Sequence, residues 1–210
     1  IVGSKGTILY TDNGGKNWRI SRWGNFNFNS IHMISPGRGF ITSDSVILKT
    51  ENGGRDWQVV ETGDTSVSYL SIAFNQNTGI IAGTKGKILY SRDYGTTWEE
   101  KTINEAKRKK KMLDLNTVFF TDRNEVWIAG NEGLILKSSD RGETWTQSNF
   151  KEYNFYSMIF LSSNEGYIAG ENGIIIRTIN GGETWRSEKI PSYRVNSMLL
   201  SAKDVWAVGN

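Results

Sequence analysis

The hydrophobic residues of the chain fall in short runs that are separated by clusters of glycine, asparagine and aspartate. Short apolar runs bounded by such turn residues are typical of β-strands. We find no convincing 3.6-residue period of an amphipathic helix, and no apolar run approaches the roughly 18 residues of a transmembrane span. The pattern therefore predicts an all-β chain of short antiparallel strands, with first strands expected at 30–34, 70–74, 116–120, 156–161 and 196–200.

One motif, Ser/Thr-x-Asn/Asp-x-Gly-x-x-Trp, recurs five times, and its tryptophans are 39, 41, 47 and 40 residues apart. The hydroxyl and the Asn or Asp side chain can hydrogen-bond the local backbone and lock a turn, while glycine supplies a positive φ. We expect each tryptophan to fold back and pack between adjacent sheets. The predicted structural residues of these boxes are Asn13, Trp18, Asn52, Trp57, Asp93, Trp98, Asp140, Trp145, Asn180 and Trp185.

A second signature, Ile-Ala-Gly-x-x-Gly, precedes three of the boxes, and the segment before the second box departs from it, with Thr42 and Ser45 expected at the glycine positions. Four strands in every repeat of about 40 residues are typical of a β-propeller blade. We therefore predict one propeller domain over 1–210 with five repeats. Each box is expected between the third and fourth strands, and the inter-blade connections on the opposite face.

Both ends of the chain carry the same piece of the repeat, Ile1–Gly6 at one end and Val205–Asn210 at the other. Two interpretations follow: the chain closes as a five-bladed ring, or it is part of a larger propeller.

The boxes resemble the Asp-box (BNR) repeat, which Ser91–Trp98 and Ser138–Trp145 match fully and the other three match with Asn in place of Asp. Together with the Ile-Ala-Gly signature, the whole chain resembles the photosystem II stability/assembly factor-like propellers. The resemblance implies a non-enzymatic scaffold that holds a partner protein of a membrane complex. It also implies an extracytoplasmic location, whether periplasmic, lumenal or secreted.

Loops carry most functions of such scaffolds, so contact residues are expected in the connections. The basic run Lys107–Lys111 is either a patch for phosphate, anionic lipid or an acidic protein, or a solvated flexible insert. Aromatic residues of the connections either form a contact platform or pack onto the next blade. The predicted contact residues are Trp23, Phe26, Phe28, Lys107, Arg108, Lys109, Lys110, Lys111, Tyr153, Tyr193 and Arg194.

The amino-acid composition excludes several kinds of catalytic and metal-binding site. The chain has no cysteine and one histidine, His32, which excludes cysteine nucleophiles, zinc–thiolate sites and histidine-rich metal sites. His32 is expected in a first strand, where it could face the central channel. The net charge of +3 is far from that of a dedicated nucleic-acid binder. We therefore predict no metal, no cofactor and no nucleic-acid partner, while peripheral membrane contact stays open.

The enzyme alternative is a glycoside hydrolase, because Asp boxes also occur in sialidases and xyloglucan-degrading enzymes. Such chemistry needs a converging pair of carboxyl groups or a tyrosine with its acid. Spacing does not single out Asp44, Asp64, Glu132 or Glu171, and Lys189 precedes Ile190-Pro191 where a sialidase would have arginine. We predict no catalytic residues. The remaining alternative to a protein partner is a lectin-like module that binds glycans.

Overall fold

The computed structural model describes residues 1–61, 64–103, 107–108, 111–150, 153–191, 194–201 and 204–210. The chain divides into two compact units, Ile1–Glu100 (unit 1) and Lys101–Asn210 (unit 2), which we describe separately. In the described ranges, regular structure other than strands is confined to single 3₁₀ turns. None of these is long and apolar enough to cross a membrane.

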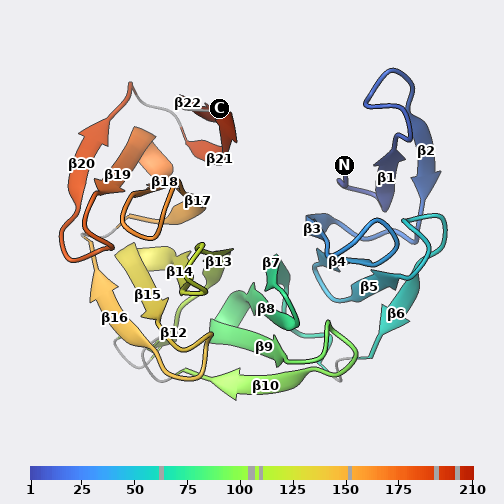
Figure 1. The fold of residues 1–210 in the computed structure, drawn as a ribbon, viewed down its shortest axis with the longest axis horizontal. Helices are drawn as coiled ribbons and strands as arrows, with labels where there is room; N and C mark the ends of the chain where they lie inside the picture. Colours follow the sequence, from blue (N-terminus) through green and yellow to red (C-terminus); the bar gives the residue numbers. More distant parts are fainter. Residues whose placement is uncertain (62–63, 104–106, 109–110, 151–152, 192–193, 202–203) are drawn as a thin grey trace. The chain divides into compact units, whose positions relative to one another are not determined.

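Unit 1 contains a two-stranded sheet and two four-stranded sheets, all antiparallel, with strands in sequence order (Figure 1). The two-stranded sheet pairs β1 (Thr7–Tyr10) with β2 (Arg19–Arg22). The next sheet is β3 (Phe28–Met33), β4 (Gly39–Ser43), β5 (Ile47–Thr50) and β6 (Gln58–Val60). The third is β7 (Tyr69–Asn75), β8 (Thr78–Gly83), β9 (Lys87–Ser91) and β10 (Glu99–Thr102), whose last residues continue into unit 2.

Unit 2 repeats this architecture with two further four-stranded sheets (Figure 1). They are β13 (Leu115–Phe120), β14 (Val126–Gly130), β15 (Leu134–Ser138) and β16 (Thr146–Asn149), then β17 (Phe155–Phe160), β18 (Gly166–Gly170), β19 (Ile174–Thr178) and β20 (Arg186–Lys189). Two hairpins complete it: β11 (Lys107–Arg108) with β12 (Lys111–Met112), and β21 (Val195–Ser201) with β22 (Asp204–Gly209).

Burial follows strand position. The second strands β4, β8 and β14 are buried along their whole length, whereas the fourth strands β2, β16 and β20 are exposed throughout. The apolar runs of the sequence are therefore the inner strands, and the polar fourth strands form the solvated edges. This confirms the predicted all-β propeller architecture.

The segment around the basic run differs from the expected loop. Lys107 pairs with Met112 and Arg108 with Lys111 in an antiparallel hairpin, and the flanking residues Ile103 and Leu113 are buried. The described part of the run therefore forms a β-hairpin between two buried aliphatic residues, and its role as a binding patch or as an insert stays a prediction.

The glycine signature has a steric cause. Gly170 stands at the first glycine position, where a Cβ would lie 2.1 Å from the carbonyl oxygen of Asn154. Gly173 stands at the second position with φ +70°, and a Cβ there would lie 2.1 Å from the carbonyl oxygen of Ile190. In the sheet β3–β6 the pairing Phe28–Ser43 replaces Phe155–Gly170. The residue at the first glycine position is therefore Ser43, and the assignment to Thr42 was wrong by one residue.

All five boxes lie between third and fourth strands, as predicted. In each box, the Ser or Thr hydroxyl accepts a hydrogen bond from the N–H of the glycine four residues later, at 2.7–2.9 Å. The same hydroxyl donates a hydrogen bond to the Asn or Asp side chain, at 2.7–3.1 Å. The same Asn or Asp oxygen accepts the N–H of the residue before the tryptophan at 2.8–3.0 Å. The motif is thus a self-contained turn lock.

The box tryptophans are less buried than expected. Trp98 packs edge-on against Phe40 and Phe74, with ring centroids 5.8 and 5.7 Å away, and Trp185 against Trp127 at 5.9 Å. Phe40 and Trp127 belong to the neighbouring sheets, so packing between sheets is confirmed for Trp98 and Trp185. However, Trp98, Trp145 and Trp185 are only half-buried and Trp18 is exposed.

Candidate functional site

In both units, the turn between second and third strands is clasped by the connection that leads to the next sheet. The Gly6 N–H donates to the Phe26 carbonyl at 2.7 Å, and the Trp23 N–H donates to the Gly6 carbonyl at 2.9 Å. In unit 2, Gly133 makes the same two bonds with Tyr153 and Phe150, at 2.6 and 2.9 Å. We call the surface that these turns and connections form within each unit its connection face.

The predicted aromatic residues of unit 1 divide into two groups. Phe28 is buried in β3 and belongs to the core, so it leaves the set of contact residues. Trp23 and Phe26 are half-buried, with ring centroids 5.8 Å apart, and they pack on a core that includes Ile8 and Ile41. Each therefore presents part of its ring to solvent at the connection face.

Charged groups surround the same face of unit 1. Lys87 Nζ lies 3.0 Å from Asp64 and 2.7 Å from Glu100. Hydrogen bonds from the Ser66 backbone, then from Lys87 and the Ser66 hydroxyl, lower the pKa of Asp64 to about 2. Nearby, Asp44 accepts a hydrogen bond from Asn27 at 2.8 Å. Asp64 is therefore held ionised by its neighbours.

The connection face of unit 2 contains a matching polar network. Asn154 donates its backbone N–H and its side-chain amide to the two oxygens of Glu171, both at 3.0 Å, and its own oxygen accepts the Glu132 N–H at 3.1 Å. Tyr153, one of the predicted contact residues, is half-buried and packs against the core cluster around Trp127. Phe155, from the same connection, is fully buried in β17.

Arg194 is the most pronounced feature of this face. Its side chain is exposed, and its guanidinium lies 3.8 Å from the centroid of the Tyr156 ring. A guanidinium stacked on an aromatic ring keeps its N–H donors in the plane, where they can bind a carboxylate in a bidentate manner. Tyr156 was not predicted, because its role depends on a residue in the next connection.

Two asparagines were also missed. Asn29 donates to the Tyr69 carbonyl at 3.0 Å, and Asn116 donates to the Phe155 carbonyl at 2.7 Å. Each asparagine is the second residue of the first strand of its sheet and lies at the bulge of that strand. Its hydrogen bond joins this strand to the first strand of the following sheet. An asparagine at the second position of two first strands is the sequence signal that could have found them.

Three further groups of predicted residues remain. Lys109, Lys110 and Tyr193 fall outside the described residues, and the structure describes only the backbone of Lys107, Arg108 and Lys111. His32 packs 5.6 Å from the Phe74 ring, and burial lowers its pKa. Its neighbour in unit 1 is therefore an aromatic residue of the next sheet.

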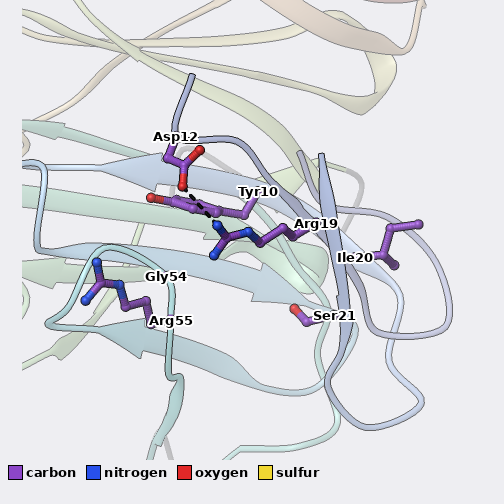
Figure 2. A pocket seen from close by; sticks show the side chains of 7 residues that line it. All are labelled: Tyr10, Asp12, Arg19, Ile20, Ser21, Gly54 and Arg55. Carbon is purple, nitrogen blue, oxygen red and sulfur yellow. Dashed lines mark hydrogen bonds and ion pairs between the residues drawn. The ribbon is translucent and has the colours of Figure 1, made fainter. Parts of the chain in front are cut away.

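Three arginines of unit 1, Arg19, Arg38 and Arg55, lie beside box residues. Figure 2 shows Arg19 and Arg55 in a pocket of about 270 Å³ beside Tyr10 and Asp12, next to box residue Gly54. Arg19 is paired with Asp12 at 3.3 Å, and Arg38 with Glu51 at 2.8 Å. Within the described ranges, no group of three histidine or acidic residues is placed to hold a metal ion.

Comparison with known proteins supports this description. The family of the photosynthesis system II assembly factor YCF48 matches residues 57–153, somewhat less than half of the chain. No curated protein sequence matches it. The chain is a BNR-repeat propeller that resembles the photosystem II assembly factors.

Solved structures share the fold at low sequence identity. YCF48 bound to a D1 peptide is 20% identical with a TM-score of 0.54, and the alignment covers 99% of this chain and 85% of that one. YCF48 from Cyanidioschyzon merolae is 14% identical with a TM-score of 0.61, covering 99% and 87%. An ancestral GH74 enzyme is 17% identical with a TM-score of 0.76, but the match spans 94% of this chain and only 31% of the enzyme.

Proposed function

We propose that the chain is a non-enzymatic binding propeller that holds a segment of a partner protein on its connection faces. The observation that carries the proposal is the exposed Arg194 guanidinium stacked on Tyr156, a ready donor for a carboxylate of the partner. Trp23 and Phe26 add a partly exposed aromatic pair in unit 1. Aromatic residues and arginine are the side chains that dominate protein–protein contacts.

The comparisons favour this class of ligand. A propeller of the same fold carries a D1 peptide, and the matching family is one of assembly factors. We infer by analogy that the partner is a subunit of a membrane complex and that the protein acts in an extracytoplasmic compartment. That units 1 and 2 belong to one propeller domain stays a prediction.

We do not propose a glycosidase activity. A glycosidase acid needs a raised pKa to stay protonated, whereas the hydrogen bonds around Asp64 lower its pKa to about 2. The likeness to the GH74 enzyme concerns the fold.

Site-specific photo-crosslinking in the native source tests the proposal. A photoreactive amino acid at Phe26 or Arg194 should capture one discrete protein, whereas the same group at Trp18 or Ile179, which are exposed in boxes, should not. A glycan array should give no signal. Equal capture from the box positions would contradict the proposed face, and glycan binding or hydrolysis of a β-glucan oligosaccharide would contradict the proposed class.

A further inference from the structure

The basic run lies in a hairpin that its local sequence does not explain. Arg108 pairs directly with Lys111, and Lys107 pairs with Met112. Like charges directly opposite one another destabilise an antiparallel pair. The two residues between Arg108 and Lys111 are both lysine, and neither is one of the glycine, asparagine or aspartate residues that favour a tight turn. Strand pairing and turn formation therefore do not account for five consecutive cationic residues at this place.

The hairpin is attached to unit 2 on both sides. Ile103 before it and Leu113 after it are 3% and 2% exposed. The next residue, Asp114, accepts the Asn131 N–H at its carbonyl oxygen, at 3.0 Å, and the Asn131 side-chain amide at its carboxylate, at 3.2 Å. Asn131 begins the turn between β14 and β15. The hairpin therefore belongs to a connection that joins the connection face of unit 2.

The basic run carries the whole positive excess of the chain. The chain has 25 basic and 22 acidic residues, and five of the basic ones are Lys107–Lys111. The rest of the chain has 20 basic against 22 acidic residues, which gives it a net charge of −2. The protein is therefore a weakly acidic body with one concentrated basic segment, and an anionic surface is attracted most strongly at this segment.

The composition of the run favours one kind of anion. Four of its five residues are lysine, which acts as a point charge toward phosphate, whereas arginine provides the planar fork that recognises a single carboxylate. Lysine is depleted in protein–protein interfaces, and no aromatic residue is interleaved with the run to stack on a nucleic-acid base. A dense cluster of point charges instead suits an anionic lipid surface, where every Lys or Arg near the headgroups adds to the attraction.

We propose that the hairpin β11–β12 binds the anionic headgroups of a membrane surface, so that the connection face of unit 2 lies toward that membrane. The proposal does not rest on the proposed function, because it involves neither Arg194 nor the aromatic pair of unit 1, and lipid binding is measured without a partner protein. The two are compatible, since a subunit of a membrane complex would meet the protein at the same face.

Co-sedimentation with lipid vesicles tests the proposal. The protein should bind vesicles of phosphatidylcholine with about one-third phosphatidylglycerol about 1000-fold more tightly than vesicles of phosphatidylcholine alone, because each cation near an anionic surface contributes about a fivefold factor. Raising the salt concentration from about 0.1 M to about 0.5 M should remove most of the binding, since salt screens the charges. Inorganic phosphate at the same ionic strength should not compete, because one small anion engages only part of the cluster.

Neutralising the paired cations identifies the contact. A triple variant with Lys107→Thr, Arg108→Thr and Lys111→Thr should weaken binding to the anionic vesicles about 100-fold. Its melting temperature should not fall, because the exchange removes a pair of like charges that face each other across the hairpin and threonine favours strands. Thermal unfolding of the variant therefore separates a lost lipid contact from a lost fold.

The matched control removes three positive charges elsewhere, with Lys16→Thr, Arg55→Thr and Arg123→Thr, all exposed and outside the strands. It should weaken vesicle binding no more than about twofold, because charges away from the contact are screened. Equal losses in the two triple variants would mean that net charge, and not the hairpin, drives the binding, and would overturn the proposal. Equal binding to neutral vesicles would overturn it as well, and so would a protein that binds polyglutamate or a single-stranded oligonucleotide but not the anionic vesicles.

Discussion

The box turns and the connections are the two kinds of loop that join strands in this protein, and they differ in what they repeat. All five box turns make the same hydrogen bonds through side chains of fixed type. The connections repeat only a backbone clasp, such as Gly6 with Trp23 and Phe26 or Gly133 with Phe150 and Tyr153. A clasp made by backbone groups leaves the side chains free to vary, so the connection faces are where a binding function can diverge.

The five boxes share their hydrogen bonds, but we expect their tryptophans to contribute unequally to the stability of the fold. Trp98→Ala removes two edge-on aromatic contacts and leaves a gap beside Phe40. We expect a loss of about 2–4 kcal/mol in the free energy of unfolding, which is less than a fully buried aromatic would give because Trp98 is half-buried. Urea unfolding measures it.

Trp18→Ala is the internal control for this change, since its box has the same hydrogen bonds but its ring is 45% exposed. It should cost less than about 1 kcal/mol. Equal losses at Trp18 and Trp98 would mean that the turn lock, and not packing between sheets, determines the importance of the tryptophan.

A box with Asp differs from a box with Asn in how its contribution to the free energy of unfolding depends on pH. Hydrogen bonds from the Thr144 hydroxyl and N–H lower the pKa of Asp140 from 3.8 to about 2. A carboxylate whose pKa is lowered on folding stabilises the protein above pH 3.8 and loses this contribution as the pH falls toward 2. Since Asp140 is exposed, solvent screening keeps the effect below about 1 kcal/mol.

Asp140→Asn removes the titrating group but keeps the acceptor oxygen, as Asn180 does in its own box. The difference in unfolding free energy between wild type and this variant should be constant near neutral pH and change between pH 4 and 2. Asn180→Asp should introduce the same pH dependence at the other box. A difference that does not vary with pH would mean that Asp140 is not held by these bonds.

The repeat made the fold predictable, because boxes and glycines are determined by local sterics and hydrogen bonds. Thr178, Asn180 and Gly182 lie in one turn, and a single sequence window contains every partner. The contact residues were harder to predict. Phe28 and Trp23 look alike in sequence, yet Phe28 is in a strand and buried while Trp23 is half-buried in a connection. The stacking of Arg194 on Tyr156 joins residues 38 positions apart, one in the connection before β21 and the other in strand β17.

The smallest expected effect on stability is at Arg194, and it is the one that separates the two kinds of loop most clearly. Arg194 is exposed and its stacking on Tyr156 is accessible to solvent, so Arg194→Ala should change the free energy of unfolding by no more than about 0.5 kcal/mol. The same change should weaken binding of the partner captured by crosslinking about tenfold or more, because it removes charged donors from the contact. Arg194→Lys keeps the charge but not the planar fork, and it should recover only part of that affinity. If Arg194→Ala instead destabilised the fold as much as Trp98→Ala, the connection would be a structural lock like the box, and the distinction between the two loops would not hold.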